Sequence, residues 1–437
     1  MKTIQKLCSV LLVTLIATVL LSCEKMPSSI NPFKKCSMER DLIVVISDIH
    51  MGADLAYAEC KKNLPALEEF LTQIRESANV KELVIAGDLL DEWFVPAPVD
   101  TYRGKDQADF VKRIAEANKG VFDVLKKIIR EKRILVTYVP GNHDLTITEA
   151  NVDLILPGIN QKRDPELGLG TYSPVGYPKI VIEHGHRYNF FCSPDPYSNQ
   201  DVAPGTILPP GYFFTRIAAQ YVAQGHPSVE IVLPPVTPNT SGDESQNLLY
   251  AYWKMWEWTL TNFTIEGQFD EDIIVTNVDG FTGSYSVNDV LPYQETPGGF
   301  IDVNLYKGIQ DTWVQRQEYN HVPVPVPALQ AISGSALSSE TDKQAVTQYF
   351  QNPKSNVRIV VFGHSHVPLI QSSFDHLQQK SIYVNSGTWI DNNPKKTTMN
   401  FVVITPQKED CCSETHVRLY NFENEVITLM AEDSVRL

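Results

Sequence analysis

The sequence predicts an α/β protein whose sheet is covered on both faces. Two observations predict this class: apolar, β-branched runs that each end in polar residues, and segments of helical periodicity between several of these runs. Strands that are buried on both faces read as continuous apolar runs, because helices cover the sheet on either side. With 437 residues, 43% of them apolar, the chain is long enough for one large domain with an insertion, or for two domains.

Strands and helices alternate in the first part of the chain. The apolar runs supply the strands, and apolar residues three or four positions apart supply the helices, as at Leu64, Leu67 and Leu71. The first part therefore contains strands at 42–46, 82–86, 134–139 and 179–182, and helices at 58–77 and 107–131. The last part contains strands at 357–362, 381–385, 400–405 and 416–421.

Clusters of Asp, Asn and His follow several of the predicted strands. In sheets of this class ligands bind beyond the carboxyl ends of the strands, which is where each cluster lies. D-x-H is expected about once by chance in such a chain, but G-N-H-D only on the order of 0.001 times. One histidine at a strand end is more often a core or capping residue, but six of the ten histidines lie in these clusters, which favours a shared site. The clusters are Asp48-Ile49-His50, Gly87-Asp88-Leu89-Leu90-Asp91, Gly141-Asn142-His143-Asp144, His184-Gly185-His186 and Gly363-His364-Ser365-His366.

In this order the clusters resemble the five motifs of the calcineurin-like metallophosphoesterase superfamily. Those motifs are D-x-H, G-D-x-x-[DE], G-N-H-[DE], a single His and G-H-x-H, and each has a match here. The resemblance covers about 42–187 and 355–405. It implies a four-layer α/β/β/α metallophosphoesterase sandwich with an inserted cap, and a phosphoric ester hydrolase with a dinuclear metal centre and a metal-bridging hydroxide.

The resemblance also implies a ligand role for each matching residue. Nitrogen and oxygen donors with open positions suit Mn²⁺, which is favoured, or Zn²⁺, Fe or Ni²⁺. Two cations about 3.5–4 Å apart can stabilise both the entering and the leaving oxygen of a displacement at phosphorus. The first ion would be held by Asp48, His50, Asp88 and His366, and the second by Asp88, Asn142, His184 and His364, with Asp88 as the bridge.

Four neighbouring residues are predicted to act without binding metal. His143 would be the general acid for the leaving group or would stabilise a phosphoryl oxygen, with Asp144 orienting its ring. Asp144 can equally be a helix N-cap. Asp91 is predicted to orient His50 or another ligand. His186 is predicted to support the ligands from behind or to face the substrate.

Within the superfamily, the stretch 87–93 and the His-Gly-His form of the fourth motif resemble the branch that contains UDP-2,3-diacylglucosamine pyrophosphatases. The chain departs from that branch in two respects. Those enzymes commonly carry arginine where this chain has His143, and they act on the cytoplasmic side with nucleotide substrates, whereas Cys23 of this chain predicts export. We therefore interpret the branch as structural kinship and not as substrate identity.

The first residues resemble a bacterial lipoprotein signal. Lys2 and Lys6 precede an apolar run over 7–21 that is short for a membrane span, and Leu-Leu-Ser-Cys ends at Cys23. Residues 1–22 are predicted to be the signal peptide, Cys23 the lipid-bearing N-terminus and 23–40 a tether. The alternative is an uncleaved signal anchor. The expected location is the cell envelope, on the periplasmic or surface face of a membrane.

The rest of the chain is predicted to divide into three parts. Residues 41–187 and 353–437 would form the two parts of the metallophosphoesterase domain, and 188–352 a cap inserted between the fourth and fifth motifs. The cap contains an aromatic helical run that includes Trp253 and Trp256. Such aromatic residues form the core of a cap more often than a platform for substrate.

The charge balance narrows the range of partners. A formal net charge of −15 argues against nucleic acid and against a polybasic membrane patch, because both depend on Lys and Arg. The expected partners are a phosphorylated small molecule or lipid, and a membrane through the N-terminal lipid. The leading prediction is a metal-dependent phosphoric ester hydrolase outside the cytoplasm. The alternatives are a pyrophosphatase for a lipid-linked or nucleotide-sugar substrate, and a catalytically silent binding lipoprotein.

Overall fold

The computed structural model describes residues 31–34, 39–267, 271–394, 396–408 and 413–437. The predicted signal peptide at 1–22, Cys23 and most of the tether at 23–40 lie outside these residues. Within the described ranges, no helix combines the length and the apolar composition that crossing a membrane requires.

Two sheets form the centre of the described part of the chain, which confirms the α/β class. The larger has seven strands in the order β15-β14-β13-β1-β2-β3-β4, namely β1 Leu42–Ile46, β2 Val80–Ala86, β3 Leu135–Val139, β4 Asn160–Gln161, β13 Asn400–Thr405, β14 Thr415–Glu423 and β15 Val426–Val435. The smaller has four strands in the order β11-β12-β10-β5, namely β5 Ile180–Ile182, β10 Ile359–Phe362, β11 Leu369–Phe374 and β12 Lys380–Asn385. β1 to β4 run parallel, as do β5, β10 and β12, so their carboxyl ends gather at one edge of each sheet.

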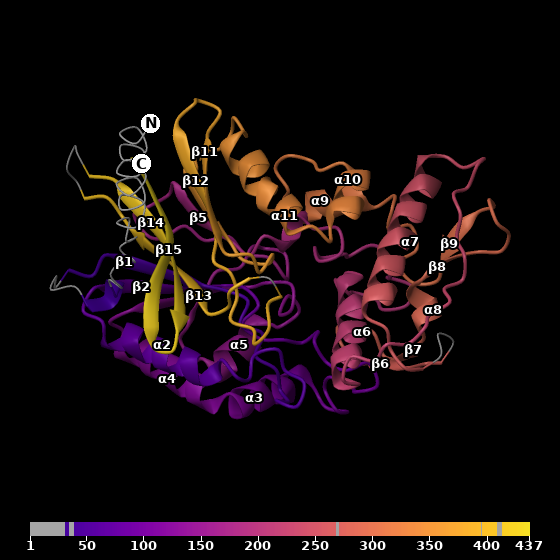
Figure 1. Ribbon diagram of the computed structural model, residues 1–437, viewed down its shortest axis with the longest axis horizontal. Helices are drawn as coiled ribbons and strands as arrows, with labels where there is room; N and C mark the ends of the chain where they lie inside the picture. The colour runs from indigo at the N-terminus through magenta and orange to yellow at the C-terminus, as the bar shows by residue number, and fades with distance from the viewer. Residues whose placement is uncertain (1–30, 35–38, 268–270, 395, 409–412) are drawn as a thin grey trace, which may run out of the picture.

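The alternation of side chains along the strands builds four layers. On β1, Ile43 and Val45 pack against the smaller sheet, whereas Val44 and Ile46 pack against the helices α2 (Leu64–Glu76), α3 (Gln107–Ala117) and α4 (Lys119–Glu131). Helix α11 (Ser338–Ala345) and the π-helical turn η3 (Val346–Phe350) cover the outer face of the smaller sheet. The layers are therefore helices, large sheet, small sheet and helix, which is the expected α/β/β/α sandwich (Figure 1).

Two of the predicted helices have different bounds in the structure. The helix expected at 107–131 is interrupted at Asn118, where the backbone leaves the helical conformation (φ −113°, ψ 33°). The side-chain amide of Asn118 donates to the carbonyls of Ile114 (2.8 Å) and Gly52 (2.9 Å), which fixes the break. The helix expected at 58–77 begins only at Leu64, with Pro65 in its first turn.

The inserted region forms a mixed body of helices and short strands beside the sandwich, at the right of Figure 1. Its aromatic residues mostly form its core: Tyr252 and Trp256 are fully buried, whereas Trp258 is 49% exposed. The same apolar cluster includes Trp93 of the sandwich, so one core runs through both parts. The elements of the insertion are α6 Gly211–Ala223, α7 Glu244–Asn262, β6 Ile274–Thr276, β7 Gly283–Tyr285, α8 Val287–Val290, β8 Pro292–Gln294, β9 Ile301–Val303, α9 Trp313–Tyr319 and α10 Ala328–Gly334.

The last residues of the predicted cap, which was expected to end at 352, pack on the sandwich. Helix α11 and the turn η3 belong by their packing to the sandwich, because Ala345 and Phe350 contact the outer face of the smaller sheet. The remaining short elements are η1 Pro32–Lys34, α5 Glu149–Ile155 and η2 His186–Tyr188.

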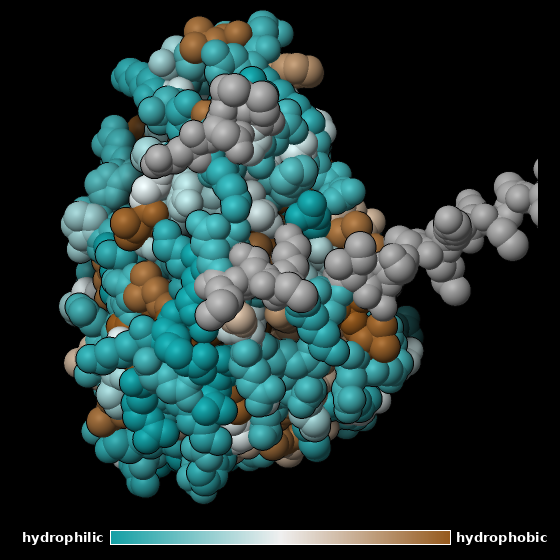
Figure 2. Space-filling view, turned by 90° about the vertical axis from the view of Figure 1, so that its left-hand side faces the viewer, coloured by the Kyte–Doolittle hydropathy of each residue, from teal (hydrophilic) through white to brown (hydrophobic). Residues whose placement is uncertain are grey.

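The side of the sandwich that faces away from the insertion is mainly hydrophilic. Figure 2 shows this face, on which hydrophobic residues occur in small separate groups. Scattered apolar residues of this kind are normal on the surface of a folded protein. The apolar residues of the sandwich therefore lie chiefly between its layers.

Candidate metal centre

The predicted site residues come together where the carboxyl ends of the two sheets meet. Strands β1, β2 and β3 of the larger sheet carry Asp48, His50, Asp88, Asn142 and His143 on the loops that follow them. Strands β5 and β10 of the smaller sheet carry His184, His364 and His366 in the same way. Because the sheets pack face to face through an apolar layer, loops that are far apart in sequence approach one another at this edge.

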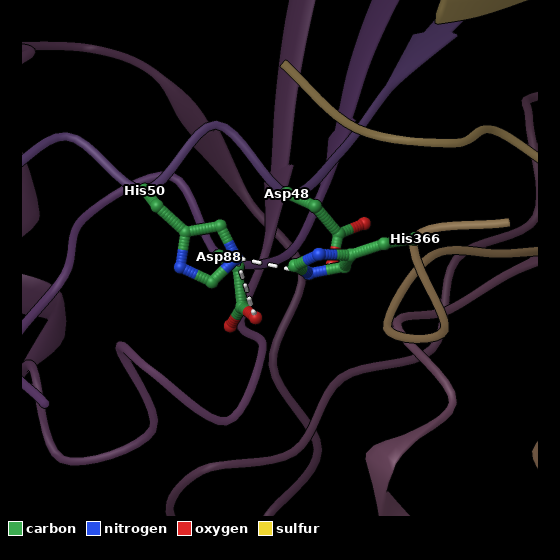
Figure 3. Close-up of side chains that lie close together, drawn as sticks. All are labelled: Asp48, His50, Asp88 and His366. Carbon is green, nitrogen blue, oxygen red and sulfur yellow. Dashed lines mark hydrogen bonds and ion pairs between the residues drawn. The ribbon is translucent and has the colours of Figure 1, made fainter. Parts of the chain in front are cut away.

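One group of donors consists of Asp48, His50, Asp88 and His366, whose side chains point toward one another in Figure 3. The Nε2 atoms of His50 and His366 are 3.2 Å apart. His366 Nε2 lies 3.1 Å from Asp48 Oδ1, and His50 Nε2 lies 3.6 Å from Asp88 Oδ2. One ligand atom from each of the four residues lies within 4.8 Å of all the others, so together they can hold a cation.

A second group of donors lies next to the first and shares Asp88 with it. Asn142 Oδ1 lies 3.1 Å from His184 Nε2 and 2.8 Å from His364 Nδ1. Asp88 Oδ2, the oxygen that faces His50, also lies 3.1 Å from His184 Nε2. The structure thus brings all seven predicted ligands together, with the Asp88 carboxylate between the two groups.

The backbone of this site is unusual. Asp48, His50, Asp88, His364 and His366 all have positive φ angles, between 51° and 65°, a region that residues other than glycine rarely adopt. Such conformations persist where the surroundings determine them, and they cluster at functional sites. The backbone conformation of the loops therefore determines how these five side chains are oriented.

The glycines of two motifs leave room for the carboxylates. A Cβ on Gly141 would lie 2.2 Å from Asp88 Oδ1, and one on Gly363 would lie 2.5 Å from Asp48 Oδ2. Backbone amides occupy the space instead: His143 N–H donates to Asp88 Oδ1 (2.8 Å), and His364 N–H donates to Asp48 Oδ1 (3.0 Å). In Asp88 this contact holds Oδ1 and leaves Oδ2 directed at the imidazoles of His50 and His184. In Asp48 both oxygens accept from His364 N–H, and Oδ1 also faces the imidazole of His366.

The charges in the site are strongly coupled. Burial alone would raise the pKa of Asp88, but the imidazoles of His184 and His143 hold it well below its ordinary value. Burial lowers the pKa of His184, but Asp88 and Asp48 outweigh it and bring that pKa to about 9. Burial and the charge of His184 lower the pKa of His364 to about 3. Carboxylates that stay ionised while buried require nearby positive charge, and a divalent cation that displaces the protons would supply it. The donor set therefore fits a metal.

Asp91 connects the two histidines that follow β1 and β3. Its Oδ2 accepts from His50 Nδ1 (3.0 Å), the contact that the predicted orienting role requires, and its Oδ1 accepts from His143 Nδ1 (2.8 Å). The His143 ring also packs on Trp93, with ring centroids 4.9 Å apart, and its side chain is 12% exposed. Since Nδ1 is used by Asp91, Nε2 is the nitrogen that His143 can offer to a substrate.

The predicted role of Asp144 as the partner of His143 is wrong. The carboxylate of Asp144 turns toward the backbone instead, accepting from the N–H groups of Gly141 (2.7 Å), Leu89 (2.9 Å) and Leu90 (3.2 Å). It does not cap a helix either, because 141–146 contains none. Asp144 ties the second motif to the third, and Asp91 orients the His143 ring.

His186 lies next to the candidate ligand His184 and belongs to neither group of donors. Its side chain is buried, its Nε2 donates to the carbonyl of Gly168 (2.9 Å), and its ring centroid is 5.3 Å from that of His184. No partner for its Nδ1 lies within the described residues. This placement is one of the two that we expected for His186.

Glu59 is a residue of the site that the sequence did not reveal. Its Oε2 lies 3.4 Å from His50 Nδ1, and its side chain is 22% exposed. It also belongs to a set of four possible metal-binding groups, with His50, Asp91 and His143. Glu59 lies in the loop between β1 and α2, outside every motif, so only the tertiary structure identifies it.

Comparison with protein families agrees with this geometry. Residues 42–207 match the family model described as calcineurin-like phosphoesterase. The match begins at β1 and includes the first four motifs, whereas Gly363–His366 lies beyond it. A search of curated proteins gave no match.

Proposed function

We propose that two divalent cations act together in this site. The proposal proceeds from the premise that residues 42–207 are a calcineurin-like phosphoesterase domain and that the protein is a metal-dependent phosphoric ester hydrolase. The observation that carries the proposal is the position of Asp88. Its Oδ2 lies 3.6 Å from His50 Nε2 of one group and 3.1 Å from His184 Nε2 of the other. A carboxylate between two sets of donors is what a pair of neighbouring cations requires.

The proposed ligands are Asp48, His50, Asp88 and His366 for one cation and Asp88, Asn142, His184 and His364 for the other. Imidazole, carboxylate and amide donors without any thiolate favour Mn²⁺, with Zn²⁺, Fe or Ni²⁺ as alternatives. When bound, the two cations would neutralise charge on the phosphoryl oxygens and make water more acidic. This local positive charge is needed because the protein as a whole carries −15.

His143 is the residue that we propose to act on the leaving group. Asp91 accepts from its Nδ1 at 2.8 Å, which fixes the tautomer and directs Nε2 away from Asp91. Burial lowers the pKa of His143, but the charge of Asp91 raises it and prevails. A protonated Nε2 can donate to the oxygen that leaves phosphorus, or to a phosphoryl oxygen.

The test of this function is a substrate panel on protein freed of metal and then reloaded with Mn²⁺. We expect hydrolysis of a monoester such as p-nitrophenyl phosphate, of a diester such as bis-p-nitrophenyl phosphate, or of both, with two equivalents of bound metal. Cleavage confined to a diphosphate such as a nucleotide sugar would establish the pyrophosphatase alternative. Metal binding without turnover on any phosphorylated substrate would support the silent binding protein.

We also propose that the enzyme acts outside the cytoplasm, held at a membrane by a lipid on Cys23. The support is the sequence alone: a basic start, a short apolar run and a small residue before the cysteine. Cys23→Ser should move the protein from the membrane fraction to the soluble fraction, because the acyl acceptor is lost. Continued sedimentation of that variant with membranes would favour an uncleaved signal anchor.

A further inference from the structure

Helix α11 carries a buried carboxylate that contacts the fifth motif, Gly363–His366. Asp342, which is 7% exposed, accepts on its Oδ1 from the hydroxyl of Ser365 (3.1 Å), the residue between His364 and His366. The same oxygen accepts from the phenol of Tyr383 on β12. Asp342 lies outside the matched range 42–207 and outside every sequence motif.

A second buried side chain completes this network. The amide of Asn385, at the carboxyl end of β12, donates to the carbonyl of Gly363 (2.6 Å) and to Ser365 Oγ (2.9 Å). Two further contacts of this amide are longer, at 3.3 Å to the phenol of Tyr383 and 3.5 Å to Asp342 Oδ1. Asn385 and Asp342 thus hold the loop 363–366 by Ser365 and by the carbonyl of Gly363.

The loop needs such support because of its backbone. His364 and His366 have φ angles of 65° and 57°, so both residues occupy a conformation that is unfavourable without outside contacts. His364 belongs to one group of donors and His366 to the other. A shift at Ser365 would therefore displace one proposed ligand of each cation.

We propose that Asp342 is a positioning residue of the metal centre: through Ser365 it aims His364 and His366, although it touches neither. This inference rests on the proposed function, since it assigns Asp342 a role toward the two cations. Nearby groups that support metal ligands typically change metal affinity by about 10–100-fold when they are removed.

The contacts of Asp342 allow its two possible roles to be separated. Its bond to Tyr383 joins helix α11 to the smaller sheet, whereas its bond to Ser365 reaches the metal loop. Tyr383→Phe removes the first bond, together with a 3.3 Å contact from the Asn385 amide to the phenol. Ser365→Ala removes the second bond, together with the bond from Asn385 to Ser365 Oγ. The test measures Mn²⁺ affinity by calorimetry and the thermal stability of the metal-free protein for both variants and for Asp342→Ala.

We expect Asp342→Ala and Ser365→Ala to weaken Mn²⁺ binding at least tenfold, while Tyr383→Phe lowers the melting temperature with little loss of affinity. Asp342→Asn should recover part of the affinity, because its amide oxygen can still accept from Ser365. Glu340→Gln is the matched control, because Glu340 lies on the same helix and pairs with Lys343 at the surface (2.6 Å).

Wild-type Mn²⁺ affinity in Ser365→Ala would overturn the proposal. An Asp342→Ala variant with a lower melting temperature but wild-type Mn²⁺ affinity would overturn it as well. A wild-type protein that binds two Mn²⁺ ions but hydrolyses no phosphorylated substrate would contradict the proposed function only. The affinities of the variants would still decide the role of Asp342 in that case.

Discussion

The two sheets contribute different chemistry to the candidate metal centre. The larger sheet supplies both carboxylates and the amide, from Asp48, Asp88 and Asn142, together with the imidazole of His50. The smaller sheet supplies imidazoles only, from His184, His364 and His366. The contacts between them, such as Asp88 to His184 at 3.1 Å and Asp48 to His366 at 3.1 Å, cross from one sheet to the other. The centre is therefore an interface between two layers, and its geometry depends on the apolar packing that fixes the sheets face to face.

The largest effect should come from the residue that touches both groups. Asp88→Asn removes a negative charge next to His50 and His184, so it should lose most bound metal and nearly all turnover. The loss should exceed the roughly 10–100-fold change that removal of a supporting residue causes. Metal analysis and hydrolysis rates of the purified variant provide the measurement. If the variant keeps two equivalents of metal and normal activity, Asp88 does not bridge the two cations.

His143→Ala tests a residue of the larger sheet that should act on substrate without binding metal. We expect full metal content and a loss of turnover of roughly 10²–10⁴-fold, the usual range for a general acid. The loss should be greatest for alkyl esters and smaller for p-nitrophenyl esters, whose leaving group needs no proton. An equal loss for both would indicate stabilisation of the phosphoryl oxygens instead. Loss of metal would place His143 among the ligands.

Removal of metal should weaken the contact between the sheets. If Mn²⁺ binds only the folded protein, a free concentration one hundred times the dissociation constant should add about 2.7 kcal/mol to the free energy of unfolding. Denaturant titrations with and without Mn²⁺ measure this difference. His364→Ala, which removes a donor of the smaller sheet, should reduce the gain, whereas the surface variant Glu340→Gln should leave it unchanged. An equal gain in all three proteins would place the stabilising ion elsewhere.

The smallest effect on the metal centre is expected at Glu92, a buried carboxylate in the loop after β2. It accepts from Tyr102, Thr146 and Gln107, and burial raises its pKa to about 7. Since the folded state holds this proton more tightly than the unfolded state, Glu92 should lower stability as the pH rises from about 4.5 to 7. Glu92→Gln resembles the protonated form and should be more stable than wild type at pH 8 by roughly 3 kcal/mol, with no such gain at pH 4. Unfolding curves at both values test this, and metal content should not change.

Most of the site could be predicted because each motif lies on one strand and the loop after it. Parallel strands bring such loops to one edge, so Asp48, Asp88, Asn142 and the histidines of β5 and β10 meet as expected. The order of the layers followed from the resemblance, and alternating burial on β1 confirms it.

The failures share a physical cause, which is that nearness in sequence is a poor guide to contact between side chains. Asp144 follows His143 directly, yet its carboxylate faces three backbone amides, and Asp91 from another loop takes its place. Glu59 and Asp342 reach the site only through the folding of a loop and a helix that carry no motif. Asn118 interrupts a periodic helical segment because its side chain finds a carbonyl outside the helix, that of Gly52.

The positive φ angles of five proposed ligands have a consequence for how far a substitution can act. A left-handed residue other than glycine costs about 1–2 kcal/mol, so the contacts around these loops must offset that cost at each of the five positions. A change in the packing behind one of the loops would therefore reach the ligand that the loop carries.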